Sequence, residues 1–297
     1  MNSPLRIVVG IATYRRRDVL SDTLRAIHNQ TRRPDRILIS TTQPEDVDAQ
    51  VAADAGAEIF VSEPGLCRQR NILLDELKNT DDAADIVVFF DDDFIPRNDY
   101  LANVEALFSE QDIASATGIL VGDDTRGPGF SLEEANRRIM QSTALLQGFP
   151  FRDVHSVYGC NMALNYHLIR DRQLRFDERL ALYGWLEDLD FSRRLSKNSR
   201  IVESPRLTGV HRAVKSGRVS GYRLGFSQIM NPLYLAKKNV VSWRWALTRA
   251  GKNALANFAG CFFPNPYMDR PGRLRGNLAA LWHLLQGKLS PEDVATL

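Results

Sequence analysis

Short apolar runs alternate with amphipathic stretches along the first two thirds of the chain. Residues 5–12, 36–40, 58–61 and 86–90 are rich in β-branched and aromatic side chains, which predicts strands, and the segments between them predict helices. Strand-helix-strand order requires crossover connections, and these join parallel strands with a right-handed sense. The pattern therefore predicts an α/β protein with a mostly parallel sheet flanked by helices.

The remaining elements follow from the same signals. Further strands are expected over residues 114–121, 154–158 and 201–203, and further helices over residues 98–109, 131 to about 147, 187 onward, 219–239 and 273–289. Pro96 is expected to end the extension that begins at residue 86, since proline has no N–H for a sheet ladder. We expect a domain over residues 1–215 and a helical region over residues 216–297.

An acidic triplet follows the most apolar of the predicted strands. Residues 86–90 are uninterruptedly apolar, as in a strand buried on both faces, and Asp91, Asp92 and Asp93 come directly after them. Ligands of open α/β sheets bind outside the carboxyl ends of the strands. Neighbouring carboxylates repel one another, and a divalent cation with a preference for oxygen ligands, Mg²⁺ or Mn²⁺, offsets that repulsion. A solvated acidic turn is the alternative interpretation.

A second acidic cluster opens the helix expected from residue 187. Glu187, Asp188 and Asp190 fall in its first turn, where the helix dipole alone favours each acid by about 0.3–1 kcal/mol. Trp185 precedes them, and an aromatic ring beside a carboxylate raises the pKa of the acid, as a general base requires. His211 lies further on, and two acidic clusters upstream favour a ligand role over a structural one.

Charge is distributed unevenly along the chain. Residues 1–200 hold 24 Lys and Arg against 32 Asp and Glu, whereas residues 201–297 hold 14 against 4. The basic C-terminal region also contains many aromatic residues, so its amphipathic helices either lie on an anionic membrane surface or pack on the domain. The acidic first part and the lack of any recognised reader motif argue against a nucleic-acid partner.

Compartment signals point one way. The three cysteines, Cys67, Cys160 and Cys261, have no metal-binding or disulfide-like spacing. No signal-peptide pattern and no apolar run of about 18 residues is present. We therefore expect a cytoplasmic protein, either free or attached peripherally to the inner face of a membrane.

The order of these motifs resembles inverting glycosyltransferase family 2, which has the GT-A fold, and in particular its bacterial polysaccharide-assembly members. The resemblance covers about residues 5–240. It rests on Thr-Tyr-x-Arg at residues 13–16, the Arg-Asn pair at 70–71, Phe-Asp-Asp-Asp-Phe-Ile-Pro at 90–96, Gly-Trp-Leu-Glu-Asp-Leu-Asp at 184–190, and the later histidine. Each piece alone is weak evidence, and their order and spacing make the combination specific.

The resemblance implies roles for individual residues. Those implied to contact the donor nucleotide are Thr13, Tyr14, Arg15, Arg70, Asp91 and Asp92. Those implied to bind Mg²⁺ or Mn²⁺ on the diphosphate are Asp91, Asp93 and His211. Asp188 is implied to be the general base, with Glu187 placing it or the acceptor, and residues 159–162 to lie beneath the sugar.

The implied activity is transfer of a hexose from a nucleotide-diphosphate sugar, most simply a UDP-sugar, to a hydroxyl of a glycan or lipid-linked saccharide. Such an in-line displacement needs a base on the acceptor and charge stabilisation on the leaving diphosphate. The loop at residues 40–46 departs from the family because it lacks an acid-rich start, although Thr41 or Gln43 offers neutral hydrogen bonds to a nucleobase. The donor nucleotide therefore stays open.

Two other functions remain as alternatives. A sugar nucleotidyltransferase also combines a parallel sheet, a nucleotide and Mg²⁺, but it usually has a glycine-rich phosphate loop, and residues 13–17 contain no glycine. A non-catalytic glycan-binding protein on the same fold would not need Asp91, Asp93, Asp188 and His211 together. The released product separates the three functions. A glycosyltransferase releases nucleoside diphosphate, a nucleotidyltransferase releases pyrophosphate, and a glycan-binding protein releases neither.

Overall fold

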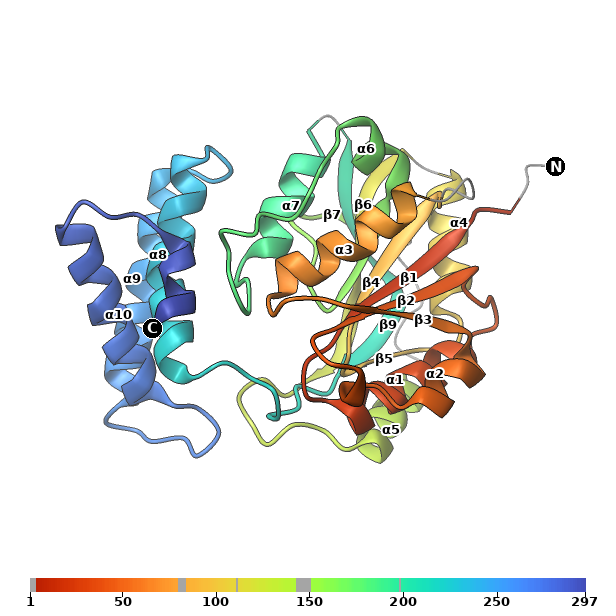
Figure 1. Cartoon of the computed structure of the whole chain (residues 1–297), viewed down its shortest axis with the longest axis horizontal. Coiled ribbons are helices and arrows are strands. Elements are labelled where there is room, and N and C mark those ends of the chain that lie inside the picture. The colour runs from red at the N-terminus through yellow and green to blue at the C-terminus, as the bar shows by residue number, and fades with distance from the viewer. Residues whose placement is uncertain (1–3, 80–83, 111, 143–150, 198) are drawn as a thin grey trace. The chain divides into compact units, whose positions relative to one another are not determined.

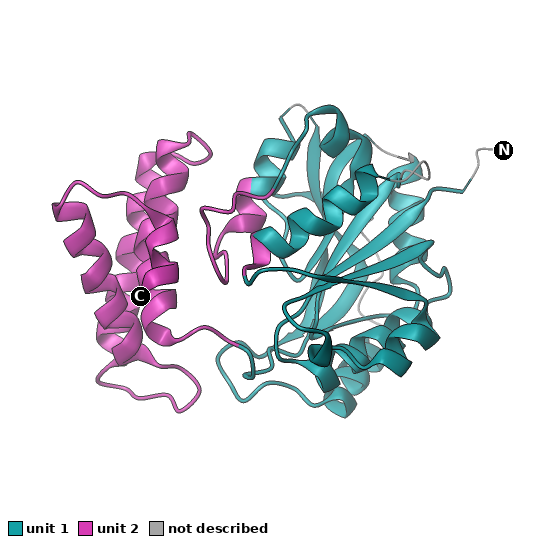
Figure 2. Cartoon of the chain, viewed as in Figure 1, with its two compact units in different colours: residues 1–64, 68–175, 191–217 teal, residues 65–67, 176–190, 218–297 magenta. Residues whose placement is uncertain are grey.

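The computed structural model describes residues 4–79, 84–110, 112–142, 151–197 and 199–297. The chain forms two compact units (Figures 1 and 2). Unit 1 comprises residues 1–64, 68–175 and 191–217, and unit 2 comprises residues 65–67, 176–190 and 218–297.

Unit 1 contains a nine-stranded mixed sheet with helices around it (Figure 1). The strand order is β3-β2-β1-β4-β8-β6-β9-β5, with β7 beside β9. The strands are β1 (Ile7–Ala12), β2 (Arg36–Thr41), β3 (Ala57–Val61), β4 (Ile86–Asp91), β5 (Phe94–Pro96), β6 (Ile113–Asp123), β7 (Arg152–Asp153), β8 (Asn161–Asn165) and β9 (Arg200–His211). The run β3-β2-β1-β4 is parallel, β8 is antiparallel to both of its neighbours, and β6 is parallel to β9. The expected α/β class and flanked, mostly parallel sheet are confirmed.

The helices fall where amphipathic segments predict them, with two additions. In chain order they are α1 (Arg17–His28), α2 (Ala49–Ala55), α3 (Leu66–Lys78), α4 (Tyr100–Glu110), α5 (Leu132–Ser142), α6 (Tyr166–Asp171), α7 (Glu187–Leu195), α8 (Gly221–Lys237), α9 (Trp243–Gly260) and α10 (Arg270–Leu285). The helices α6 and α9 were not predicted as separate elements. Residues 143–147 of the helix expected from residue 131 lie outside the described residues.

Alternating side chains of the central strands build a core on each face of the sheet. Ile7, Val9 and Ile11 of β1 join a buried cluster with residues of α1 and α4. The intervening Gly10 faces the other way, and a Cβ built there would lie 2.7 Å from the ring of Phe89 and 3.3 Å from Leu73 of α3. Glycine at this position therefore lets the Phe89 ring lie directly against β1.

Two sequence predictions in this region are wrong. Residues 154–158 form no strand; the strand is β8, which begins at Asn161, and the short β7 precedes them. Extension also resumes before Pro96, because residues 94–96 form β5 antiparallel to β9. Proline is tolerated there because β5 lies at the end of the strand order, at an edge of the sheet.

Strand register brings distant chain segments to one edge of the sheet. Ala12, the last residue of β1, is paired with Ser40 of β2 and with Asp91 of β4. His211, the last residue of β9, is paired with Phe94 of β5 and with Asp123 of β6. The polar residues at and just after these strand ends therefore meet at the same edge.

Unit 2 is built on the helices α8, α9 and α10. A Cβ at Gly225 of α8 would lie 2.0 Å from the carbonyl oxygen of Arg273, and one at Gly276 of α10 would lie 2.0 Å from that of Tyr222. The side chain of Asn257 donates to Gln228 and to Asn277, each at 2.8 Å. Paired glycines and buried amides thus join the three helices at close range.

Hydropathy gives one further fact about the described helices. None of them combines the length and the apolar composition needed to cross a membrane.

Candidate active site

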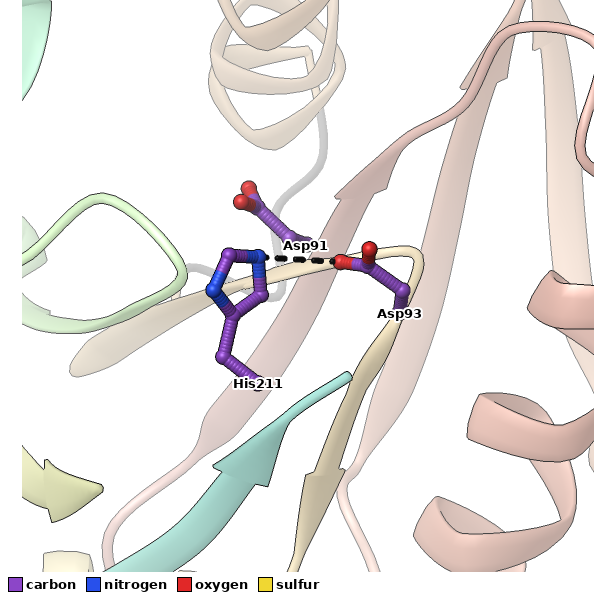
Figure 3. A group of neighbouring side chains, drawn as sticks. All are labelled: Asp91, Asp93 and His211. Atoms are coloured by element: carbon purple, nitrogen blue, oxygen red, sulfur yellow. Dashed lines mark ion pairs between the residues drawn. The ribbon is translucent and has the colours of Figure 1, made fainter. Parts of the chain in front are cut away.

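Three potential metal ligands converge at the edge where β4 and β9 end (Figure 3). Asp91 is the last residue of β4, Asp93 follows the turn after it, and His211 is the last residue of β9. One ligand atom from each lies within 4.8 Å of the other two. The Nε2 atom of His211 is 3.3 Å from Oδ1 of Asp93.

The surroundings of Asp93 fit a cation at this point. Its Oδ2 accepts a hydrogen bond from the backbone N–H of Val214 at 2.9 Å and one from Arg16 at 3.3 Å. Its Oδ1 is buried, accepts no hydrogen bond of good geometry and faces the His211 ring. Two carboxylates with one imidazole form an oxygen-rich donor set that suits Mn²⁺ or Mg²⁺. The residues present therefore fit the divalent metal that the motifs predict.

Asp123 contacts the ring nitrogen of His211 that does not face Asp93. The His211 Nδ1 atom is 3.0 Å from Oδ1 of Asp123, and the hydroxyl of Tyr158 donates to the other oxygen at 3.2 Å. A carboxylate on one ring nitrogen fixes the tautomer and turns the other nitrogen toward a metal. Burial disfavours the imidazolium, but the carboxylates of Asp123 and Asp93 raise the pKa of His211 to about 10.

Asp92, the middle residue of the triplet, is turned away into the protein. Its two oxygens accept hydrogen bonds from the hydroxyl of Thr13 at 2.8 Å and from Arg16 at 2.7 Å. Burial and the nearby charge of Asp93 raise the pKa of Asp92 to about 6, although Arg16 opposes the shift. For Asp93 burial acts in the same direction, but His211 and Arg16 outweigh it and lower its pKa.

The other residues predicted to contact the nucleotide differ in exposure. Arg70 is almost fully buried and donates to the carbonyl of Gly159 at 2.8 Å and to Asp91 at 3.2 Å. Tyr14 is half-buried and Arg15 exposed, with the guanidinium 5.0 Å from the Tyr14 ring centre. Arg70 is thus placed to orient Asp91, and Tyr14 and Arg15 are placed at the surface.

Hydrogen bonds also order the loop after β2. The buried hydroxyl of Thr41 donates to the carbonyl of Gln43 at 2.9 Å, and the Gln43 amide donates to Asp46 at 3.1 Å. The second oxygen of Asp46 accepts the backbone N–H of Arg15 at 2.8 Å. The loops after β1 and β2 are therefore joined, and the hydrogen of the Thr41 hydroxyl is engaged within the loop.

The structure does not bring the predicted base into the same unit as the metal cluster. Glu187 and Asp188 open α7 and belong to unit 2, whereas Asp91, Asp93 and His211 belong to unit 1. Glu187 is buried, and Asp188 is half-buried with its Oδ1 accepting the N–H of Leu189 at 2.7 Å.

Asp190 has a structural partner within unit 2. It is fully buried, and its Oδ1 lies 2.7 Å from the ammonium of Lys238, which also reaches Asp177 at 2.6 Å. The hydroxyl of Tyr234 donates to the same Asp177 oxygen at 2.8 Å. This cluster ties the segment at residues 176–190 to α8.

Sequence reasoning missed two residues of the site. Arg16, which spans Asp92 and Asp93, falls in the Thr-Tyr-x-Arg motif but has no predicted role, and Asp123 is not among the predicted site residues. Asp123 lies two residues beyond the strand predicted over residues 114–121, and the pairing of β6 with β9 brings it to His211. The motif marks the position of Arg16 but does not predict its contact with the two acids.

The sequence matches one family model over residues 8–172, and its description is "Glycosyl transferase family 2". A comparison with curated proteins gave no match.

Solved structures share the fold at low identity. The mannosyltransferase PcManGT of Pyrobaculum calidifontis, in complex with GDP-Man and Mn²⁺, is 16% identical with a TM-score of 0.60, over 94% of this chain and 88% of that one. Residues 1–349 of S. aureus TarS with UDP-GlcNAc are 15% identical with a TM-score of 0.53, over 78% and 67%. GalNAc-T7 with UDP, GalNAc and Mn²⁺ is 13% identical with a TM-score of 0.57, over 99% and 56%. At these identities the likeness concerns the fold.

Proposed function

The chain belongs to glycosyl transferase family 2, and from this premise we propose that it is a metal-dependent, inverting hexosyltransferase. The donor is a nucleotide-diphosphate sugar, with UDP-sugars the first to be tested, and the acceptor is a hydroxyl of a glycan or lipid-linked saccharide. Solved structures with this fold include complexes with UDP-GlcNAc and with GDP-Man and Mn²⁺. They support a nucleotide-sugar donor and leave the choice of nucleotide to experiment.

The single observation that carries the proposal is the cluster of Asp91, Asp93 and His211. It combines the strand-end position of a nucleotide site with a donor set for Mn²⁺ or Mg²⁺. A bound divalent ion would neutralise the negative charge that develops on the leaving diphosphate.

The chain's own residues prepare this position. Arg70 holds Asp91, and Asp123 holds His211, so two of the three ligands are oriented before anything binds. Arg16 places a positive charge against Asp92 and Asp93, which reduces the repulsion among the adjacent acids. The loop that follows β1 starts at the same edge of the sheet. Its residues Thr13, Tyr14 and Arg15 are proposed to contact the nucleotide.

We assign the general base to Asp188, with Glu187 placing it or the acceptor. A carboxylate oxygen of Asp188 would accept the proton of the acceptor hydroxyl. At the same time the hydroxyl oxygen of the acceptor would attack the anomeric carbon from the side opposite the diphosphate. One displacement of this kind inverts the anomeric configuration. Gly184, three residues before Glu187, has the left-handed backbone conformation that favours glycine, with φ 64°. A Cβ added at Gly184 would lie 3.2 Å from Sγ of Cys67 and 3.2 Å from Cγ of Glu187.

The test is a product assay with a panel of UDP- and GDP-sugars, Mn²⁺ or Mg²⁺, and saccharide acceptors. Release of nucleoside diphosphate with an inverted glycoside supports the proposal, and release of pyrophosphate would instead identify a nucleotidyltransferase. Binding of saccharide without turnover of any donor would favour a glycan-binding protein.

The Asp188→Asn variant tests the base within the same assay. An amide cannot take the proton, so transfer should fall by about 10²–10⁴-fold while metal-dependent donor binding is retained. Normal turnover in this variant would move the base elsewhere, without affecting the assignment of the metal cluster.

The proposed site of action is the cytoplasmic face of a membrane. None of Cys67, Cys160 and Cys261 forms a disulfide within the described part of the chain, as is usual in a reducing compartment. A lipid-linked acceptor would present its hydroxyl at the membrane surface, so the proposal includes peripheral association with an anionic bilayer.

A further inference from the structure

Large apolar side chains are exposed along α9 and the loop that follows it. Trp243, Leu247, Leu255, Phe258 and Phe262 are between 51% and 68% exposed. At 100° per residue, the four positions that lie within α9 fall in one arc of about 120°, and Phe262 follows in the turn after the helix. They therefore form a continuous apolar stripe rather than scattered contacts.

The helix α10 has a second stripe of the same kind. Leu278, Leu281, Trp282 and Leu285 are between 45% and 81% exposed and follow the i, i+3, i+4, i+7 spacing of one helix face. Phe263 and Tyr267 in the loop between the two helices add exposed aromatic rings. We call the residues of both stripes and of this loop the α9–α10 surface.

The helices α9 and α10 bury small side chains and expose large apolar ones, which is the reverse of an amphipathic helix on a water-exposed surface. The buried residues of α9 are Ala246, Ala250 and Asn257, and those of α10 are Gly272, Gly276, Asn277 and Ala280. Small side chains and paired amides therefore make the helix contacts, while Leu, Phe and Trp point outward. Membrane-embedded helices associate through small and amide residues in the same way.

The charges on the two helices of this surface have one sign. The helices α9 and α10 contain Arg and Lys but no Asp or Glu. Arg244, Lys252 and Arg275 are exposed, and no carboxylate within the described residues forms an ion pair with any of them. Basic residues among exposed Trp, Tyr and Leu are typical of segments that lie in the headgroup layer of an anionic bilayer.

We propose that the α9–α10 surface docks on an anionic phospholipid bilayer, with its apolar stripes in the headgroup layer and its basic residues on the lipid phosphates. A second copy of the chain fits less well, because a symmetric contact would bring like charges together. No described helix could span the bilayer, so the attachment is to its surface. This proposal assigns the membrane association suggested above to a defined surface.

The test is cosedimentation of the full chain with vesicles of phosphatidylcholine alone or mixed with phosphatidylglycerol. All four tryptophans, Trp185, Trp243, Trp245 and Trp282, lie in unit 2, so a blue shift of their emission reports insertion of this unit. We expect binding to the anionic vesicles, with the blue shift, and weaker binding at high salt.

Two sets of substitutions separate the apolar contribution to membrane binding from the electrostatic one. The triple change Leu281→Gln, Trp282→Gln and Leu285→Gln removes apolar area at exposed positions, where folding should be unaffected. The triple change Arg244→Gln, Lys252→Gln and Arg275→Gln should weaken partition by about fivefold per residue, so about a hundredfold in all. The matched control is Met140→Gln with Arg137→Gln on α5, an exposed apolar and an exposed basic residue of unit 1.

Loss of binding in both triple variants, with the control unchanged and far-UV melting curves that match, supports the proposal. Equal binding by wild type and both variants, or no binding of wild type to anionic vesicles at low salt, overturns it. A wild-type dimer that the apolar variant converts to monomer would assign the surface to a second copy instead. The assay contains no donor, metal or acceptor, so its failure is distinguishable from failure of the proposed transferase activity.

Discussion

The three adjacent aspartates at the end of β4 and in the turn after it have different surroundings, although the sequence alone does not distinguish them. Asp92 is turned inward onto Thr13 and Arg16, whereas Asp91 and Asp93 lie beside His211. A turn that begins as β4 ends at Asp91 and finishes before β5 starts at Phe94 produces this alternation. An Asp-x-Asp pair can therefore act together while the middle acid stabilises the loop that follows β1.

Asp123 allows a direct test of the metal cluster. Asp123→Asn keeps the size of the side chain but removes the charge that orients and polarises His211, so Mn²⁺ affinity should fall by about 10–100-fold. Calorimetry or Mn²⁺ electron paramagnetic resonance on the donor-free chain measures this without any catalytic step.

A second histidine–carboxylate pair provides the control for that experiment. The Nε2 atom of His167 lies 2.7 Å from Oδ1 of Asp85, at another position in unit 1. Asp85→Asn should leave Mn²⁺ affinity unchanged. If Asp123→Asn were equally silent, His211 would be oriented by other contacts and the positioning role of Asp123 would be wrong.

Among the elements, glycines and a buried amide in unit 2 determine how closely its helices pack. Gly272 and Gly276 of the segment at residues 272–278 are buried in α10, and Asn277 donates to the carbonyl of Gly225 at 2.7 Å. This segment therefore sets how closely α8 and α10 approach, which is a packing role.

Two glycine substitutions should change stability in opposite directions. Gly276→Ala places a methyl group 2.0 Å from a backbone oxygen of α8, so the helices must separate, at a cost of about 2–3 kcal/mol. At Gly251, in α9, a Cβ would meet nothing within 4 Å, so Gly251→Ala should stabilise by about 0.5–1 kcal/mol through helix propensity. Urea unfolding followed by tryptophan emission measures both, and equal effects of the two changes would contradict the close contact.

The Lys238 cluster should make unit 2 sensitive to acid. Burial raises the pKa of Asp177, but Lys238 and Tyr234 outweigh it, so the folded-state pKa is lowered. A lowered pKa adds stability above the ordinary pKa of aspartate, and this contribution is lost as the pH falls through the folded value. Lys238→Met leaves the fully buried Asp190 without its ammonium and should cost about 3 kcal/mol at pH 7.

Urea unfolding of wild type and Lys238→Met from pH 7 to pH 3 checks this expectation. The stability difference should narrow toward low pH, as Asp177 becomes protonated and needs no cation. A difference that is constant with pH would show that Lys238 acts through the packing of its alkyl chain rather than through charge.

For the whole molecule, the sequence predicts what depends on local pattern. The strands β1 to β4 were found because their apolar runs are continuous, and Asp91 and Asp93 because they come directly after such a run. His211 was found because two acidic clusters precede it in the chain and because the resemblance includes a later histidine. The strand β8 was missed because its ends, Asn161 and Asn165, are polar, and its place between β4 and β6 is decided by long-range antiparallel pairing. Asp123 was missed for the same kind of reason, since only the pairing of β6 with β9 brings it to His211.

Donor binding should raise the thermal stability of the whole chain. A ligand at a hundredfold excess over its Kd that binds only the folded state adds about 2.7 kcal/mol of stability. For a chain of 297 residues this should raise the Tm by about 3–8 °C, since larger proteins shift less per kcal/mol. The shift should require both Mn²⁺ or Mg²⁺ and one nucleotide-sugar, and a chelator should abolish it.

Asp93→Ala is the informative variant in that panel. It removes the carboxylate whose buried Oδ1 faces His211, so the metal-dependent part of the shift should disappear while the variant still melts cooperatively. Retention of the full shift would place the metal elsewhere. If wild type showed no shift with any nucleotide-sugar and any metal, the fold would stand, but the same cluster would have to serve a protein that binds glycans without transferring sugar.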